Sequence, residues 1–202
     1  MNKNTLRTLA ISGAVLISSV ALAGCTINLG SSDSDKNSGM MGNNGMMGNS
    51  SSSSTFSGSD IMFAQMMIIH HQQAVDMGTL AETRASSQEV KSLAAQIKAE
   101  QAPEIAQMEG WLKASNVNPG MGHDMAMTGM LTYVEMTALK NAKGAEFDRL
   151  YLADMIGHHK GAIQMAQMVV DSQNVEANKL GHAIIESQTK QITDMESLLA
   201  KK

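Results

Sequence analysis

The sequence predicts an all-α protein, in which residues 60–202 form an antiparallel four-helix bundle made of two helical hairpins. Three observations predict this class. Apolar residues recur at helical spacing from residue 60 onward. The second half of the region repeats the first, so two similar hairpins are expected. Each hairpin has one apolar face, and two such faces are most simply buried against each other.

Residues 1–24 have the features of a lipoprotein signal peptide. Lys3 and Arg7 precede an apolar stretch that is too short for a typical membrane-spanning helix and that ends in LAGC. LAGC resembles the lipobox of bacterial lipoproteins, which implies cleavage before Cys25 and lipidation of its thiol; an ordinary secretory signal is the alternative. We therefore expect an exported protein, held by a lipid anchor at the extracytoplasmic face of the bacterial cell envelope.

Residues 25–59 are predicted to be a flexible tether. Ser, Gly and Asn dominate this segment, so it cannot bury enough apolar surface to fold. It contains two Met-Met pairs within GMMGNNGMMGN, a weaker candidate for metal binding. Cys25 is the only cysteine, so the bundle has no disulfide and no thiolate ligand. Any metal site in the bundle must use His, Met and carboxylates.

The bundle is predicted to consist of repeat one at 60–115, a Met-rich connector at 116–131 and repeat two at 132–202. In repeat one, Ser86 and Glu89 have the spacing of a capping box that starts the second helix. In repeat two, a short helix is expected after Thr132, followed by two long helices. The first long helix of each repeat has an apolar arc, formed in repeat one by Phe63, Met67, His70, Ala74, Met77 and Ala81.

The repeat is clearest in one eleven-residue cassette. MIIHHQQAVDM at 67–77 recurs as MIGHHKGAIQM at 155–165, with six of eleven positions identical. Matched residues of the two cassettes lie 88 positions apart in the sequence. In the second helix of each hairpin the matched residues lie 87 positions apart, as Gln101 and Gln188 do. The difference falls in the turn between the helices of each hairpin.

The cassettes place thioether and imidazole groups one helical turn apart, as in Met66–His70, Met67–His71 and Met155–His159. Thioether sulfur is soft and suits Cu(I) or Ag(I) better than Mg(II) or Ca(II). Adjacent histidines point about 100° apart around a helix axis, so each should face a different neighbour. The candidate helical ligands are His70, His71, His158, His159, Met66, Met67, Met77, Met155 and Met165.

The connector contains a second group of candidate ligands, Met121, His123, Met125 and Met127. Its Met-x-His-x-Met spacing resembles the Met-rich loops of extracytoplasmic copper proteins. Packing does not explain a Met-rich loop, because a loop of this kind buries nothing; flexible low-complexity sequence is the alternative to metal binding there. For the helical Met residues, by contrast, packing in the core is an alternative to metal binding, since Met fills irregular gaps.

The second cassette and its surroundings resemble the bacterial family catalogued as domain of unknown function 305. The matching residues are Phe147, Asp148, Met155, Ile156, His158, His159, Ala162, Ile163, Met165 and Ala166. The resemblance covers about residues 60–200 and implies a ferritin-like helical bundle, usually exported, with some members associated with copper. Asp154 departs from the first cassette, which has Met66 at the matching position, so the two metal environments are expected to differ.

Charge and motifs narrow the function further. The net charge is −4 and the isoelectric point about 5.8, which excludes the basic surface of a nucleic-acid-binding protein. No di-iron, zinc-protease, serine-hydrolase or phosphate-loop motif occurs, so no enzymatic reaction is indicated beyond copper redox chemistry. The sequence predicts a tethered protein that sequesters or buffers copper, with Cu(I) favoured over Cu(II) and with Cu(II) and Ag(I) left open. A structural or interaction lipoprotein, with His and Met as packing residues, is the alternative, and homo-oligomerisation is left open.

Overall fold

The computed structural model describes residues 55–119 and 127–201, and within them the chain forms five helices and no strand. The helices are α1 (Gly58–Arg84), α2 (Gln88–Ala114), α3 (Tyr133–Asn141), α4 (Gly144–Ala166) and α5 (Val175–Leu199). The all-α prediction is confirmed. The short helix α3 follows Thr132, as expected. The predicted signal peptide, Cys25, most of the tether, and the connector residues Met121, His123 and Met125 lie outside the described residues.

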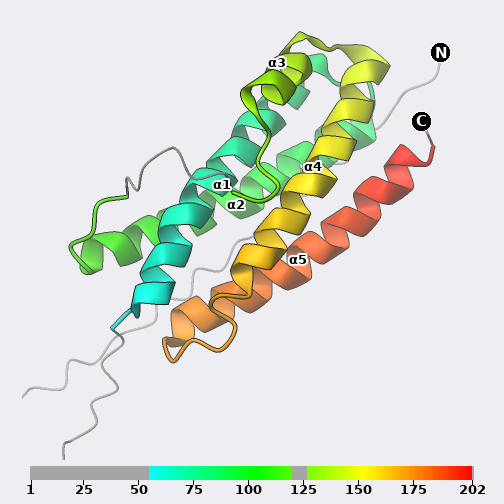
Figure 1. Cartoon of the computed structure of the whole chain (residues 1–202). Coiled ribbons are helices and arrows are strands. Elements are labelled where there is room, and N and C mark those ends of the chain that lie inside the picture. The colour runs from blue at the N-terminus through cyan, green and yellow to red at the C-terminus, as the bar shows by residue number, and fades with distance from the viewer. Residues whose placement is uncertain (1–54, 120–126, 202) are drawn as a thin grey trace, which may run out of the picture. The chain divides into compact units, whose positions relative to one another are not determined.

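The long helices form two hairpins (Figure 1). α1 packs along α2, and α4 packs along α5, while the two hairpins meet chiefly through α1 and α4. Ala85, which follows the end of α1, pairs with Gly144 at the start of α4. The end of α1 therefore lies beside the start of α4, and the two helices run antiparallel. α2 and α5 touch much less, so each contacts mainly the other helix of its own hairpin.

Side-chain caps fix where the helices begin. Ser57 and Thr132 form capping boxes with Asp60 and Glu135, and Asn174 caps α5. The predicted cap at Ser86 was wrong by one residue, because Ser87 accepts the hydrogen bond from Val90 N.

Ser86 does not cap α2 because it is bonded to Asp148 of the other hairpin. Both the backbone N–H and the hydroxyl of Ser86 donate to this carboxylate, at 3.0 and 2.7 Å, and the backbone N–H of Ser87 donates at 3.0 Å. Asp148 is fully buried. It therefore fastens the α1–α2 turn onto the start of α4.

The apolar core consists of two clusters at opposite ends of the hairpins. The first is centred on Met77, Ala81, Val90, Leu93, Ile97, Phe147, Tyr151, Leu152, Met155 and Met195. The second is centred on Phe63, Met67, Met108, Trp111, Leu112, Ala162, Met165, Leu180 and Ile184. All four long helices contribute to both clusters, so every long helix passes from one cluster to the other.

No helix in the described part of the chain combines the length and apolar character needed to cross a bilayer.

Candidate metal centre

A layer of buried polar side chains separates the two apolar clusters. On each long helix, the polar residues fall between the residues of the first cluster and those of the second. The layer consists of His70 and His71 on α1, Gln101 on α2, His158 and His159 on α4, and Gln188 and Gln191 on α5. We call these seven residues the histidine layer. The four histidines have no exposed surface.

His70 and His158 meet across the interface between the hairpins. Their ring centroids are 3.7 Å apart, and the ring planes are inclined by 36°. Burial, with His71 and His159 nearby, lowers the pKa of His70 to about 3. Burial and the neighbouring His70 hold the pKa of His158 well below its usual value. Both rings are therefore uncharged at neutral pH, which is the form that binds a metal ion.

The second histidine of each pair turns toward the other helix of its own hairpin. His71 Nε2 lies 2.7 Å from Glu104 Oε2 on α2, and His159 Nε2 lies 2.6 Å from Gln191 Oε1 on α5. Glu104 and Gln191 are matched positions, since they differ by the offset of 87 that relates the second helices. Adjacent histidines thus face different neighbours, as the sequence predicted.

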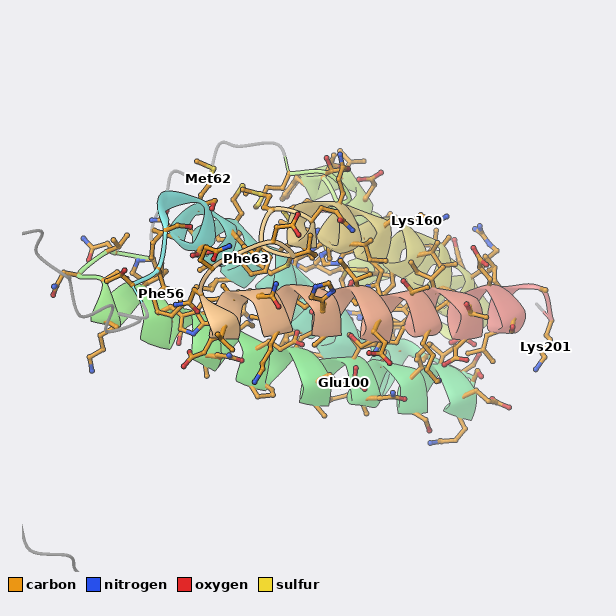
Figure 2. The ribbon with its side chains drawn as sticks, turned by 90° about the horizontal axis from the view of Figure 1, so that it is seen from below. Phe56, Met62, Phe63, Glu100, Lys160 and Lys201 are labelled. Carbon is orange, nitrogen blue, oxygen red and sulfur yellow. The ribbon has the colours of Figure 1, made fainter. Side chains whose placement is uncertain are left out.

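Gln191 also links the hairpins on the side where α2 and α5 approach each other. Its Nε2 donates a 2.6 Å hydrogen bond to Glu100 Oε2. Figure 2 labels Glu100 on α2, near the middle of the helix. Burial lowers the pKa of the attached His159 to about 4, although its hydrogen bond to Gln191 acts in the opposite direction.

Unpartnered polar atoms concentrate in the histidine layer. Eleven buried side-chain nitrogen or oxygen atoms of the described residues have no hydrogen-bond partner, and nine belong to the layer. They are Nδ1 of His70, His71 and His159, both ring nitrogens of His158, and both amide atoms of Gln101 and Gln188. An unmet buried polar group costs about 1–3 kcal/mol, so unmet groups in one place call for a ligand or water. Packing alone does not explain the layer.

The end of the connector lies against the layer. The Thr128 carbonyl is 3.3 Å from His70 Nε2, and the Gln73 amide exchanges two hydrogen bonds with the Leu131 backbone. On α4 the connector packs so closely that a methyl group at Gly161 would overlap the Thr128 carbonyl. Gln73 and Gly161 are matched positions of the two cassettes. The residue types at these two positions differ because the connector forms hydrogen bonds with Gln73 of one hairpin and packs closely against Gly161 of the other.

The helical methionines flank the layer from both apolar clusters. Met67 and Met165 belong to the second cluster, and Met77 and Met155 to the first. Met66 and Met127 are partly buried and pack against the second cluster. These six residues therefore have packing roles, and their role as ligands stays a prediction.

The described residues of the histidine layer do not form a preorganised site of carboxylate ligands. In the described residues, no three His, Cys, Asp or Glu side chains are grouped so that they could hold one ion. The donors that are present are buried imidazole nitrogens with thioethers one turn away on the same helices. This donor set fits soft Cu(I) or Ag(I) rather than a hard cation that needs many oxygen ligands.

Asp154, which replaces the methionine of the first cassette, lies outside the layer. It is half-buried and lines a small cavity together with Glu135, Met130 and Gly157. Burial, with a further contribution from Glu135, raises its pKa to about 6. The expected difference between the two cassettes is thus a difference at the surface.

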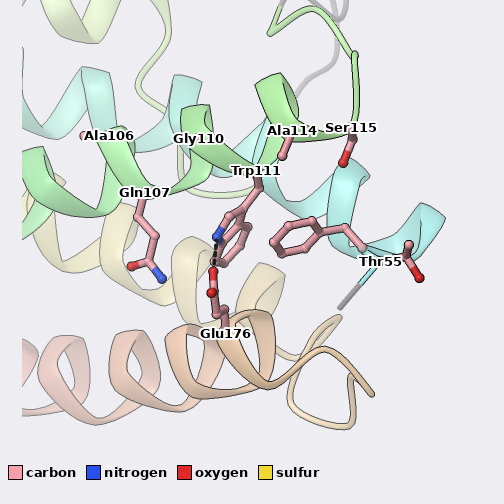
Figure 3. Close-up of a pocket in the computed structure, with 9 residues that line it drawn as sticks. Thr55, Ala106, Gln107, Gly110, Trp111, Ala114, Ser115 and Glu176 are labelled. Carbon is pink, nitrogen blue, oxygen red and sulfur yellow. Dashed lines mark hydrogen bonds between the residues drawn. The ribbon is translucent and has the colours of Figure 1, made fainter. Parts of the chain in front are cut away.

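A larger cavity, of about 690 Å³, lies near the N-terminal end of α1 (Figure 3). Phe56 stacks on Trp111 there with a centroid distance of 4.9 Å, and Trp111 Nε1 donates to Glu176. None of the predicted ligands lines it. We therefore assign the candidate site to the histidine layer.

Four residues of the site and its surroundings were not predicted from the sequence: Gln101, Glu104, Gln188 and Gln191. Gln101 and Gln188 were matched by the repeat but given no role. A polar residue at a matched, core-facing position in both halves was the available signal. Glu104 and Gln191 differ in type, so only their common offset could have paired them.

Comparison with known proteins places the chain in a family. The model of the family described as domain of unknown function, DUF305, matches residues 60–199. A protein from Streptomyces coelicolor, described as a secreted DUF305 protein, is 34% identical, with a TM-score of 0.67; the match covers 71% of this chain and 93% of that one. A DUF305 fragment from Deinococcus radiodurans is 30% identical, with a TM-score of 0.68, over 72% of this chain and 98% of that one.

A third similar structure contains copper. CopM in its Cu(I)-bound form is 33% identical, with a TM-score of 0.61, over 70% of this chain and 96% of that one. CopM has also been solved with Cu(II) and with silver. No curated protein sequence matches the chain. Because the family model covers most of the chain, and with it both histidine cassettes, the chain belongs to the DUF305 family.

Proposed function

We propose that this chain binds Cu(I) in the histidine layer and so sequesters or buffers copper outside the cytoplasm. The observation that carries the proposal is the concentration of buried imidazole nitrogens without hydrogen-bond partners in that layer. The copper-bound and silver-bound forms of the similar protein CopM support copper as the metal. His70, His71, His158 and His159 would supply nitrogen, and the flanking methionines would add sulfur.

The layer's position explains how a helical bundle would hold such an ion. The four helices would form a ferritin-like four-helix bundle whose apolar clusters close both ends of the layer. An environment of this kind keeps His70, His158 and His159 uncharged at neutral pH and excludes hard, strongly hydrated cations. The connector methionines and His123 would form a second site.

We also propose that residues 1–24 are a signal peptide and that Cys25 carries a lipid anchor. The LAGC motif and the secreted relative from Streptomyces coelicolor support export. If the anchor is present, Cys25→Ser should move the protein from the membrane fraction to the soluble fraction. Unchanged membrane association of this variant would contradict the anchor.

Copper titration against a chromophoric Cu(I) chelator tests the central proposal. Replacing His70, His71, His158 and His159 by Gln should lower the Cu(I) affinity by at least about 100-fold, since even outer-shell changes cost 10- to 100-fold. His182→Gln, at an exposed position on α5, is the matched control and should leave the affinity unchanged. Equal affinity of the fourfold variant and the parent chain would remove the layer from the function.

A structural role for the layer makes a different prediction. If His and Met only packed the bundle, Cu(I) or Ag(I) would leave the melting temperature unchanged. A ligand that binds only the folded state must raise it. We expect the metal to raise it in the parent chain and to do so much less in the fourfold variant.

A further inference from the structure

Three histidines of the layer share one hydrogen-bonding pattern. In His70, His71 and His159, Nε2 is bonded, whereas Nδ1 is buried and has no partner. The three bonded partners belong to the connector, to α2 and to α5. A pattern produced by three independent elements indicates a requirement of the site rather than a local accident.

The chemistry of two partners fixes the proton on Nε2. The Thr128 carbonyl and the Glu104 carboxylate can only accept hydrogen bonds. His70 and His71 must therefore donate from Nε2, and their neutral forms carry an unprotonated Nδ1.

The third partner is Gln191, and a further residue, Glu100, fixes the orientation of its amide. A glutamine side chain can offer either its oxygen or its amino group. Gln191 donates from Nε2 to Glu100 Oε2 at 2.6 Å, which leaves Oε1 facing His159 Nε2, also at 2.6 Å. Glu100 thus sets the proton position of His159 through Gln191. In the other hairpin, Glu104 does the same for His71 by direct contact.

We propose that Glu104 and Glu100 are positioning residues for the metal, which hold His71 and His159 as Nε2–H tautomers so that both rings bind through Nδ1. This inference rests on the proposed function. Metal-bound histidines commonly donate their second ring N–H to a carboxylate or a carbonyl, which fixes the ring and strengthens it as a ligand. In the layer, Nε2 of His71 and of His159 has an accepting partner, and Nδ1 of each ring is buried without one.

Nitrogen-15 NMR of the histidine rings tests the inference in the metal-free chain at pH 7. Long-range proton–nitrogen correlations distinguish the two neutral tautomers and the charged ring. We expect Nε2–H for His71 and His159. On addition of Ag(I), a diamagnetic analogue of Cu(I), the large nitrogen shift should occur at Nδ1 of both rings.

Leucine variants test the roles of Glu104 and Glu100 one at a time. Glu104→Leu should disturb the tautomer of His71 alone, and Glu100→Leu that of His159 alone. Each should weaken Ag(I) binding by about 10- to 100-fold. Glu109→Leu, at an exposed position on the same helix, is the control and should change neither the tautomers nor the affinity.

The outcomes distinguish this inference from the proposed function. Charged or Nδ1–H rings at His71 and His159, in a chain that still binds Ag(I), would overturn the inference and leave metal binding standing. Nε2–H rings in a chain that binds neither Ag(I) nor Cu(I) would instead overturn the proposed function, and with it the role of Nδ1 as a ligand. The parent-chain measurement decides between these outcomes even where a leucine variant fails to fold.

Discussion

His70 of α1 and His158 of α4 lie in contact across the interface between the two hairpins, with ring centroids 3.7 Å apart, ring planes inclined by 36° and no exposed surface. Two charged imidazoles could not occupy these positions without strong repulsion in a medium of low polarity. The contact therefore excludes two charged rings, and burial lowers the pKa of both so that each is neutral at pH 7.

Acid should destabilise the metal-free fold. The pKa of His70 is about 3 and that of His159 about 4 in the folded chain, both lowered from 6.5 by burial. The unfolded chain therefore binds more protons than the folded chain below about pH 6.5, so the free energy of unfolding falls as the pH falls toward these values. Each histidine should contribute a loss of about 2 kcal/mol between pH 6.5 and pH 5.

Denaturant unfolding at pH 7 and pH 5 measures this loss. The double variant His70→Leu, His159→Leu should show a much smaller difference between the two pH values. His182→Gln, at an exposed site, should behave like the parent chain. Equal stability of the parent chain at both pH values would contradict the neutral, buried state of the rings.

Replacing His158 by Leu should separate metal binding from packing. Both ring nitrogens of His158 are buried without partners, so an apolar side chain of similar volume removes an unmet cost of about 1–3 kcal/mol. We expect an unchanged or higher free energy of unfolding in the metal-free variant, together with weaker Cu(I) binding. A packing role predicts the reverse, a less stable fold with the same affinity.

Asp148→Ala should destabilise the fold without changing the metal site. The substitution removes the acceptor of three hydrogen bonds from Ser86 and Ser87 and should cost on the order of 3 kcal/mol. Denaturant unfolding measures the loss, with exposed Asp171→Ala as the control. Cu(I) affinity at a temperature where the variant is folded should match that of the parent chain. A lower affinity would show that the turn and the site are coupled.

Gly161→Ala should displace the end of the connector. The added methyl group would overlap the Thr128 carbonyl, so the hydrogen bond to His70 should be lost, at a cost of about 1–3 kcal/mol. NMR of the His70 ring and denaturant unfolding would report both effects. Gly157→Ala on the same helix is the matched control, because its methyl group would meet nothing within 4 Å. Equal behaviour of the two variants would contradict the close packing of the connector on α4.

Much of the fold follows from sequence patterns that act locally. Helical periodicity predicted the four long helices, and the Thr132–Glu135 pair marks the start of α3. The cap of α2 was misplaced because Ser86 and Ser87 are both chemically suited to it, and the choice depends on Asp148, 62 residues further along the chain from Ser86. A long-range contact of this kind has no local signal.

The site could be predicted only in part, for a related reason. The His-His pairs stood out because they interrupt an apolar arc twice at equal spacing. Glu104 and Gln191 did not, since each has the ordinary appearance of a polar residue on a helix surface. The meeting of His70 with His158, and the bonding of Gln191 to Glu100, depend on how two hairpins pack, which helical periodicity alone does not specify.

The most direct test of copper binding in the histidine layer is anomalous scattering at the copper absorption edge, measured on crystals of the Cu(I)-loaded chain. We expect copper in the histidine layer between the two apolar clusters, bonded to nitrogen of at least two of His70, His71, His158 and His159. Copper found only at the connector or elsewhere on the surface, with the rings of His70, His71 and His159 hydrogen-bonded as in the metal-free chain, would contradict it.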